Sequence, residues 1–504
     1  MSKVVIIGSG LGGLSCGYIL QKNGYDVTIL EQGVQIGGCL QCFTRKGAKF
    51  ETGMHFIGSC DEGQTMNAVM RYLGLLDDIK LSQLDTTAYD RVCLAGAQFC
   101  FANGKEAFID KMASYFPKEK DNLTRYMSII EQVASASKLK SLTSGTRDAH
   151  LDTEYQMRSI NSVLDELFDD EILKSVLVGN IPLYSAERDK TPFSQHAFIM
   201  DFYNQSAYRI IGGSDAIAQS LARSIEEMGG KVLTRKKVVK IECDDTQAKG
   251  VITADENFYD ADYVISTVHP NRMLEMLDTK LIRPAFRARI KSIPNSAASF
   301  GVYVKFKDKV VPYMNSNYYG YTGGTPWGCE HYSSAEWPKG FLYMHMCHED
   351  KAQWARSGVI LSYMNMEDVA QWKGTKIGRR GTDYEAFKTM KAEVLMRQVE
   401  RHFPGFMDAV DCYYTSTPLT YIDYTGTEDG SMYGVSKDIN LGVAGRVPYK
   451  TKIPNLLLAG QNVNSHGMMG VIVGTIVTCS ELVPADVIYE QIKEANKQWE
   501  KAQS

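Results

Sequence analysis

Four short apolar runs recur along the chain, each next to glycines or to a helix-like segment. They cover residues 4–7, 27–30, 261–267 and 455–459. Their apolar positions are largely consecutive instead of alternating with polar ones, as in strands that are covered on both faces. The runs therefore predict a doubly wound parallel sheet, and we expect an α/β fold.

The first run leads directly into a cluster of glycines. The residues of this turn are Gly8, Gly10, Leu11, Gly12 and Gly13. Such glycines let the backbone turn tightly into a helix whose free N–H groups face a pyrophosphate. The second run ends in Glu31, about twenty residues further on, where a carboxylate can accept hydrogen bonds from ribose hydroxyls. The whole unit predicts a dinucleotide site.

Further motifs distinguish between the possible dinucleotides. The first group beyond Glu31 comprises Gly37, Gly38, Gly53, Met54 and His55. NAD dehydrogenases have no general need for these residues, whereas the chain must follow an extended FAD, with glycines wherever the backbone approaches the ligand. FAD is therefore the favoured cofactor.

The C-terminal apolar run supports FAD. The residues that follow it and that we expect at the cofactor are Gly460, Gln461, Asn462, Gly470 and Val471. A helix that begins at residues 466–470 would place its positive dipole end beside the flavin ring, where reduction adds negative charge. An ordinary turn between a strand and a helix is the alternative for this segment taken alone.

Several of these motifs together resemble a known family. They are residues 37–39, 51–58, 425–431 and 460–461, with 211–217 and 229–232 between them. In this combination the chain resembles the phytoene desaturase superfamily, and most of all its retinol saturase and carotenoid isomerase branch. The resemblance implies an FAD-dependent oxidoreductase acting on C=C bonds of isoprenoid lipids, and it implies that the backbone of Val238 contacts the adenine.

The resemblance and the motifs predict a discontinuous flavin domain. Its Rossmann-like FAD-binding pieces are residues 1–75, 205–275 and 425–504, the last including a C-terminal helix. Residues 76–204 and 276–424 would build one interleaved α+β substrate domain. Within it, residues 161–177 read as a charged amphipathic helix and residues 298–305 as a strand.

Composition narrows the classes of partner. The 504 residues carry a net charge of −4 from 55 basic and 59 acidic side chains spread along the chain, so no nucleic-acid partner is expected. The basic run at 235–237 is expected to be a solvated strand edge. Since the first strand begins by residue 4 and no apolar run reaches about eighteen residues, we expect neither a signal peptide nor a transmembrane span. We expect a cytoplasmic protein, with peripheral membrane contact left open by the resemblance.

Two clusters invite redox or metal chemistry. Cys39 and Cys42 form a CxxC pair near the expected cofactor. This pair would be either a relay that exchanges electrons between the flavin and a disulfide, or two packed thiols. The eleven cysteines, an odd number scattered over a long chain, favour reduced thiols. His345, Cys347 and His348 suggest a metal, but in a strand His348 would point away from the other two. No metal site is predicted.

Catalytic candidates come from the motifs that should flank the flavin. His55 and His466 are the first choices for a proton donor or a stabiliser of the anionic ring, with Tyr421 and Tyr424 as substitutes. The interval 313–343 is rich in aromatic residues and glycines. It would line a tunnel for a polyene, form aromatic cross-strand pairs on a sheet, or do both.

The scaffold leaves the direction of the reaction open. Saturation is slightly favoured over desaturation, with carotenoid cis-trans isomerisation by reduced FAD as the next alternative and a non-catalytic flavin-bearing lipid carrier outside redox catalysis. No strand followed by GxGxxG occurs after residue 13, and residues 320–328 read as a loop. Electrons are therefore expected to be exchanged with an external donor or acceptor, a quinone or a reductase.

Overall fold

The structure is a computed structural model that describes residues 1–136 and 149–503. Within these residues a five-stranded sheet, here called the parallel sheet, has the order β10-β2-β1-β14-β20 and parallel pairing throughout. Its strands are β1 (Lys3–Ile7), β2 (Asp26–Leu30), β10 (Lys231–Leu233), β14 (Tyr263–Ser266) and β20 (Leu456–Leu458). The predicted α/β fold is confirmed, and the four apolar runs supply four of these strands.

Both faces of the parallel sheet are covered, which explains the consecutive apolar residues. Val4 and Ile6 pack with the helices on one face, whereas Val5 and Ile7 pack with an antiparallel sheet and two short helices on the other. The helices of the first face are α1 (Leu11–Lys22), α2 (Thr65–Tyr72), α10 (Asp215–Glu227), α16 (Gly467–Cys479) and α17 (Ala485–Gln503). The elements of the second face are β11 (Val238–Cys243), β12 (Ala248–Thr253), β13 (Phe258–Asp260), α11 (Pro270–Glu275) and α12 (Pro284–Lys291).

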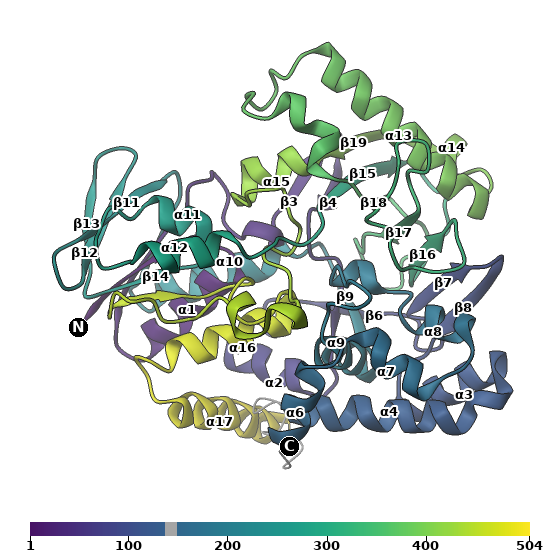
Figure 1. Ribbon diagram of the computed structural model, residues 1–504, viewed down its shortest axis with the longest axis horizontal. Coiled ribbons are helices and arrows are strands. Elements are labelled where there is room, and N and C mark those ends of the chain that lie inside the picture. The colour runs from purple at the N-terminus through teal and green to yellow at the C-terminus, as the bar shows by residue number, and fades with distance from the viewer. Residues whose placement is uncertain (137–148, 504) are drawn as a thin grey trace.

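A second large sheet, here called the mixed sheet, stands beside the first (Figure 1). In the described part of the chain its order is β19-β15-β18-β17-β16-β7-β8, with β16 and β7 parallel and its other neighbours antiparallel. Its strands are β7 (Asp90–Leu94), β8 (Ala97–Phe101), β15 (Ser299–Phe306), β16 (Asn317–Tyr321), β17 (Gly340–His345), β18 (Ser357–Tyr363) and β19 (Val410–Ser416). Strands from both expected substrate segments thus share one sheet, while the limits of the domains stay a prediction.

Helices also cover the mixed sheet on two sides, as Figure 1 shows. One apolar cluster joins the sheet to α13 (Thr382–His402), α14 (Phe406–Ala409) and α15 (Pro418–Thr425). A larger cluster joins its other face to α3 (Lys105–Tyr115), α4 (Lys120–Ser135), α7 (Ile160–Leu167), α8 (Glu171–Leu177) and α9 (Phe193–Gln205), with α6 (Ala149–Gln156) alongside. The remaining helical turns are η1 (Gly38–Leu40), η2 (Pro117–Glu119), η3 (Ile181–Leu183), η4 (Met366–Trp372) and η5 (Ile439–Gly445).

Short strands connect the two large sheets. They are the hairpin β3 (Cys42–Arg45) and β4 (Ala48–Glu51), and the small sheet of β5 (Ile57–Gly58), β9 (Ala207–Ile210) and β6 (Leu81–Gln83). None of the described helices is both long and apolar enough to cross a bilayer.

Three local predictions are corrected by the structure. The helix expected over 161–177 is two helices, α7 and α8, because the Asp170 carboxylate caps α8 by accepting the N–H groups of Ile172 and Leu173, each at 2.9 Å. Residues 235–237 are not a strand edge but the turn between β10 and β11. Gly320 belongs to β16, so the loop expected over 320–328 begins two residues later.

Candidate functional site

A cavity of about 660 Å³ is lined by both halves of the molecule. Its walls include the glycine turn after β1 on one side and the strands β15, β17 and β18 of the mixed sheet on the other. The volume falls in the range of about 300–1,000 Å³ that is usual for ligand sites. It is the place to test whether FAD fits.

The glycines after β1 perform different tasks. Gly8 has φ +99°, in the left-handed region, which lets the chain leave the strand. A Cβ on Gly10 would meet no atom within 4 Å and would point into open space. A Cβ on Gly12 would lie 2.8 Å from the Gly460 Cα, and one on Gly13 would lie 2.0 Å from the Gly8 carbonyl oxygen. Gly10 therefore leaves room for a ligand, whereas Gly12 and Gly13 permit close packing.

The N-terminus of α1 is open to the cavity. Its N-cap is Gly10, with no side-chain cap and no acidic residue in the first turn, and Leu11 also lines the cavity. Gly37, with φ +112°, forms a bridge to Gly10. Free N–H groups at the positive end of a helix form a site for a phosphate.

Glu31 lies at the end of β2 and lines the same cavity. Its carboxylate accepts the Ser9 N–H at 3.0 Å, the Ser9 hydroxyl at 2.7 Å and the Gly33 N–H at 2.7 Å. These bonds hold the carboxylate beside the glycine turn. Val238, the first residue of β11, lines the cavity at this end.

The C-terminal motif brings a second uncapped helix to the cavity. Gly460, Gln461 and Asn462 line the cavity, and α16 begins behind them at Gly467 with no side-chain cap and no acidic residue in its first turn. The Asn462 Oδ1 accepts the Val435 N–H at 3.0 Å. Two helix N-termini, a carboxylate and a cradle with room at Gly10 together fit a dinucleotide whose phosphates and anionic ring need positive partners.

Most of the residues predicted for the cofactor line this cavity. They are Gly8, Gly10, Leu11, Gly12, Glu31, Gly37, Gly38, Gly53, Met54, His55, Val238, Gly460, Gln461, Asn462 and Val471. Gly13 and Gly470 do not. A Cβ on Gly470 would lie 2.7 Å from the Ser465 Cβ, so this glycine serves packing at the start of α16.

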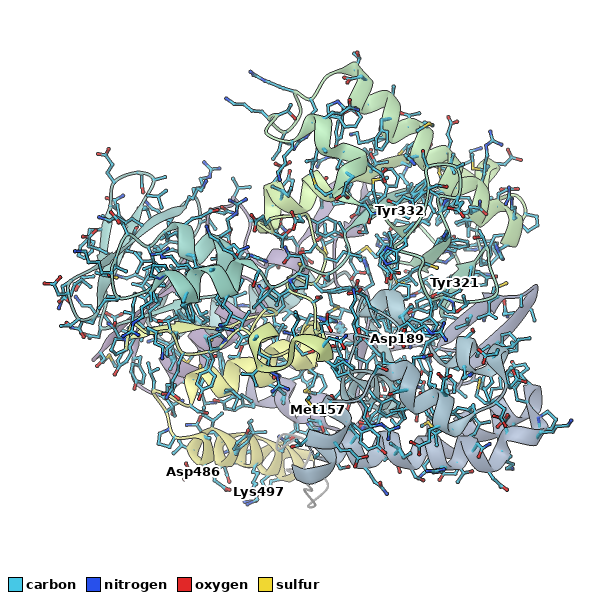
Figure 2. The ribbon with its side chains drawn as sticks, in the orientation of Figure 1. Met157, Asp189, Tyr321, Tyr332, Asp486 and Lys497 are labelled. Atoms are coloured by element: carbon cyan, nitrogen blue, oxygen red, sulfur yellow. The ribbon has the colours of Figure 1, made fainter. Side chains whose placement is uncertain are left out.

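The other end of the cavity is largely apolar and aromatic. Its lining includes Phe56, Pro182, Leu183, Tyr203, Tyr321, Cys329, Phe341, Leu342, Leu361, Tyr363, Met432 and Tyr433. Tyr321 is labelled in Figure 2 within the mixed-sheet half of the molecule. Of these aromatic residues, Tyr321 and Phe341 lie in the interval 313–343 to which the sequence pointed. Tyr203, Tyr363 and Tyr433 lie on other segments, and no motif marks them.

Residues of the aromatic interval lie both on the cavity wall and in the packing of the mixed sheet. Tyr321 and Phe341 line the cavity, whereas Tyr318 stacks on Phe341 at 6.2 Å and contacts Phe403 at 4.8 Å in the core under α13. Tyr332, also labelled in Figure 2, donates its hydroxyl to Asp368 at 2.6 Å. The interval therefore contributes both cavity wall and sheet packing.

His55 and His466 occupy different environments. His55 is 8% exposed and lines the cavity, and neither ring nitrogen has a hydrogen-bond partner among the described residues. The ring of His466 lies behind the cavity wall, stacked on Tyr433 at 4.4 Å. Burial, reinforced by the Lys437 ammonium, lowers the pKa of His466 to about 3, so this imidazole is neutral at neutral pH.

The two tyrosine candidates also differ. Tyr421 lines the cavity, and its hydroxyl lies 3.1 Å from the Ser299 hydroxyl. Burial raises the pKa of Tyr421 well above its usual value, so the hydroxyl keeps its proton. Tyr424 also lines the cavity but is 58% exposed.

The CxxC cysteines are free thiols. Cys39 lines the cavity, and burial raises its pKa to about 11. Burial and the nearby Glu51 carboxylate raise the pKa of Cys42 to about 12. Because the thiolate is the reactive form, these environments disfavour a redox relay.

The histidines near residue 345 are engaged in other hydrogen bonds. The His345 Nδ1 accepts the Met314 N–H at 2.9 Å, and its Nε2 lies 2.6 Å from the Tyr343 hydroxyl. The His348 Nε2 lies 2.9 Å from the Ser357 hydroxyl. Among the residues with described positions, no three His, Cys, Asp or Glu side chains are grouped to hold a metal ion.

The fold and the cavity define an FAD-dependent oxidoreductase, and FAD is the cofactor, as predicted. Residues 11–375 match the family described as flavin containing amine oxidoreductase, and the chain belongs to this family. It is 28% identical to all-trans-retinol 13,14-reductase of Rattus norvegicus over 97% of this chain and 86% of the relative. It is 21% identical to prolycopene isomerase 2, chloroplastic, of an Oncidium hybrid cultivar over 97% and 84%. These relatives confirm the resemblance noted from the motifs.

A solved structure shares the fold. An oxidoreductase from Methanosarcina mazei aligns with a TM-score of 0.63 and 16% identity, over 95% of this chain and 100% of that one. At this identity the likeness concerns the arrangement of the elements.

Proposed function

We propose that this FAD-dependent oxidoreductase acts on a C=C bond of a retinoid, carotenoid or related isoprenoid lipid, with saturation ahead of desaturation. The observation that carries the proposal is the apolar, aromatic end of the cavity, which continues directly from the residues assigned to the cofactor. A long apolar substrate can be buried there with one bond beside the cofactor. The near full-length similarity to a retinol reductase supports this substrate class.

Different residues along the cavity are assigned to different parts of FAD and of the substrate. We assign the pyrophosphate to the N–H groups at the start of α1, the ribose to Glu31, and the neighbourhood of the flavin to the start of α16. When bound, FAD exchanges an electron pair and one hydrogen with the substrate. The aromatic wall excludes water and orients the polyene, and His55 is the first candidate to hold or move the proton.

Carotenoid cis-trans isomerisation is the second candidate, supported by the similarity to a prolycopene isomerase. One experiment separates the outcomes. Purified, FAD-loaded and chemically reduced protein is incubated with all-trans-retinol or with a cis-carotenoid, and the extract is analysed by chromatography and mass spectrometry. A gain of two hydrogens supports saturation, and an unchanged mass with altered retention supports isomerisation. Loss of two hydrogens with the oxidised protein indicates desaturation, and binding without change indicates a lipid carrier.

We also propose that electrons are exchanged with an external quinone or reductase. The sequence has no second GxGxxG after a strand, so no usual site for NAD(P)H accompanies the flavin site. Stopped-flow mixing with NADH or NADPH should bleach the flavin slowly. Rapid and saturable bleaching would overturn this proposal. Peripheral membrane contact stays a prediction.

A further inference from the structure

Two tyrosines of the cavity wall bind backbone carbonyls with their hydroxyls. The Tyr321 hydroxyl donates to the Gly179 carbonyl at 2.6 Å, and the Tyr433 hydroxyl donates to the Pro182 carbonyl at 2.9 Å. Because a phenolic hydroxyl has one proton, neither group can donate to a ligand without losing its present bond. These two side chains therefore contribute shape and apolar surface to the wall.

Three further tyrosines line the same cavity. The Tyr421 hydroxyl contacts a serine hydroxyl, as described above. Burial raises the pKa of Tyr363 well above its usual value, and an interaction with the Ser185 side chain opposes this shift. Tyr424 is more than half exposed. The tyrosine of the described wall that is left is Tyr203.

Tyr203 lies near the end of α9 and lines the cavity. Within residues 1–136 and 149–503 its hydroxyl has no hydrogen-bond partner, yet it is not sealed in the core as the hydroxyls of Tyr89 and Tyr319 are. Burial raises the pKa of Tyr203 above its usual value, and the Asp90 carboxylate adds to this shift, so the hydroxyl keeps its proton. A protonated hydroxyl deep in the protein is thus open to the cavity.

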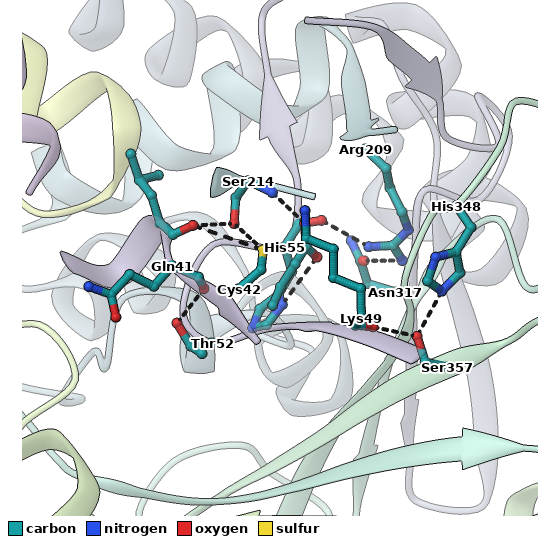
Figure 3. Close-up of polar contacts among 12 residues, drawn as sticks. Gln41, Cys42, Lys49, Thr52, His55, Arg209, Ser214, Asn317, His348 and Ser357 are labelled. Carbon is teal, nitrogen blue, oxygen red and sulfur yellow. Dashed lines mark hydrogen bonds and ion pairs between the residues drawn. The ribbon is translucent and has the colours of Figure 1, made fainter. Parts of the chain in front are cut away.

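The Asp90 carboxylate is bound by residues other than Tyr203. Its Oδ1 accepts the Asn317 amide at 2.8 Å, and its Oδ2 accepts a second asparagine amide at 3.4 Å. The Asn317 Oδ1 accepts the Arg209 guanidinium at 2.9 Å, and Arg209 also donates to the His55 carbonyl at 3.2 Å (Figure 3). Each oxygen of Asp90 therefore has a donor that is not the Tyr203 hydroxyl.

The ring of Tyr203 is held in place by its neighbours. Its centroid lies 4.5 Å from that of Phe56 and 5.0 Å from that of Phe202, and the Asn103 amide donates to the Tyr203 carbonyl at 2.7 Å. Phe56 also lines the cavity and directly follows His55 in the chain. Tyr203 therefore lies where the apolar end of the cavity meets residues assigned to the cofactor.

A free hydroxyl in an apolar wall discriminates between apolar ligands. A polyene that fills this end of the cavity takes the place of any water at the Tyr203 hydroxyl. The hydroxyl is then a buried donor without a partner, unless the ligand itself carries an acceptor. A hydroxyl or carbonyl oxygen on the polyene supplies that acceptor, whereas a hydrocarbon does not.

We propose that Tyr203 is a specificity-determining residue whose hydroxyl donates a hydrogen bond to an oxygen atom of the polyene, and so favours an oxygen-bearing polyene over a hydrocarbon. This proposal rests on the proposed function and narrows its substrate class. It concerns binding alone, because the Tyr203 proton stays on its oxygen and no covalent bond changes. A polyene alcohol and a hydrocarbon carotenoid are therefore not equivalent ligands for this chain.

Tyr203→Phe is the decisive variant. It keeps the ring against Phe56 and removes a hydroxyl that has no partner in the described part of the protein, so the Tm should not fall. Tyr319→Phe is the matched control. It also removes a hydroxyl without a partner, from a fully buried tyrosine of β16 that is not among the residues of the described cavity wall.

Ligand binding to the FAD-loaded, oxidised protein tests the contact. Equilibrium dialysis, with the ligand quantified by chromatography, compares all-trans-retinol with its deoxy analogue, in which a methyl group replaces the CH₂OH group. Tyr203→Phe should weaken binding of the alcohol about tenfold and leave binding of the hydrocarbon unchanged or tighter, while Tyr319→Phe should bind both like the wild type. Equal effects on both ligands, or wild-type affinity for the alcohol in Tyr203→Phe, would overturn the proposal.

The two proposals can fail separately. If the wild type binds the alcohol through Tyr203 but converts no polyene, the proposed function fails and the contact stands. If the wild type converts a polyene and Tyr203→Phe leaves the preference for the alcohol unchanged, the contact fails and the proposed function stands. If the wild type binds neither ligand, the contact fails, and conversion of a cis-carotenoid decides the proposed function by itself.

Discussion

The parallel sheet and the mixed sheet are built from the sequence in different ways. In the first, β1, the glycine turn, α1 and β2 occupy one stretch, residues 3–30, and this local unit supplies Gly8, Gly10, Leu11 and Gly12 to the cavity. In the second, β7 pairs with β16, and Asn317 donates a hydrogen bond to Asp90 across 227 positions. This difference shows that a cofactor site can be predicted from a local motif. The aromatic wall of the cavity, in contrast, is assembled from segments far apart in the sequence.

The two regions also treat buried charge differently. Glu31 is satisfied by backbone N–H groups of its own local unit and by the Ser9 hydroxyl. Asp90, the first residue of β7 in the mixed sheet, and Arg209, in the neighbouring strand β9, are both buried and interact through Asn317. Burial raises the pKa of Asp90 to about 7, against the opposing effect of its amide partners and of Arg209. Removing either Asp90 or Arg209 should lower the free energy of unfolding, because the remaining charged side chain would be buried without its partner.

The largest effect is expected for Arg209→Met. It removes the donors to the His55 and Ser316 carbonyls and to the Asn317 amide, and it should lower the free energy of unfolding by about 3–5 kcal/mol. Urea unfolding measures this loss. Arg223→Met is the control, since Arg223 is 55% exposed and pairs with Asp78 at 3.2 Å, and it should cost less than about 1 kcal/mol. If both variants lost the same free energy of unfolding, the hydrogen bonds of the buried Arg209 guanidinium would not contribute more to stability than an exposed ion pair.

Two glycine variants test which glycine of the turn after β1 serves packing and which leaves room for FAD. Gly13→Ala places a Cβ 2.0 Å from the Gly8 carbonyl oxygen and should destabilise the apoprotein by about 1–3 kcal/mol. Gly10→Ala meets no atom, so the apoprotein should keep its Tm while FAD binds more weakly. Thermal unfolding and FAD titration separate the two effects. Weaker FAD binding without destabilisation in Gly13→Ala would contradict the division of tasks.

Glu31→Ala tests the cofactor end without touching the mixed sheet. It should weaken FAD binding by about 1–3 kcal/mol, because a charged hydrogen-bond acceptor is lost and the Ser9 and Gly33 N–H groups lose their partner. Titration of the apoprotein followed by flavin fluorescence gives the affinity. Glu227→Ala, at an exposed position of α10, is the control and should bind FAD like the wild type. Unchanged affinity in Glu31→Ala would remove Glu31 from the site.

The smallest effect is expected at the aromatic wall. The Tyr321 hydroxyl donates to the Gly179 carbonyl at 2.6 Å, so Tyr321→Phe should cost about 0.5–1.5 kcal/mol of unfolding free energy and leave FAD binding unchanged. Denaturant unfolding and FAD titration measure both. A loss of FAD binding in this variant would mean that the aromatic end of the cavity also contributes to FAD binding.

The motifs by themselves determined four of the five strands of the parallel sheet, the glycine turn after β1 and FAD. They do so because a left-handed glycine and an uncapped helix N-terminus are local backbone properties that residues 8–13 specify with few neighbours. A local pattern gave a wrong prediction at residues 161–177. Its periodicity indicated one helix, whereas the cap at Asp170 starts a second one.

Only the tertiary structure decided which predicted residues line the cavity. Gly10 and Gly13 look alike in the motif, yet one borders the cavity and the other packs against Gly8. His55 lines the cavity beside Glu51, whereas His466 lies behind Tyr433. These outcomes depend on how segments pack against one another, as Gly12 does against Gly460 and Arg209 against the His55 carbonyl, and the spacing of residues along the chain carries no information about such contacts.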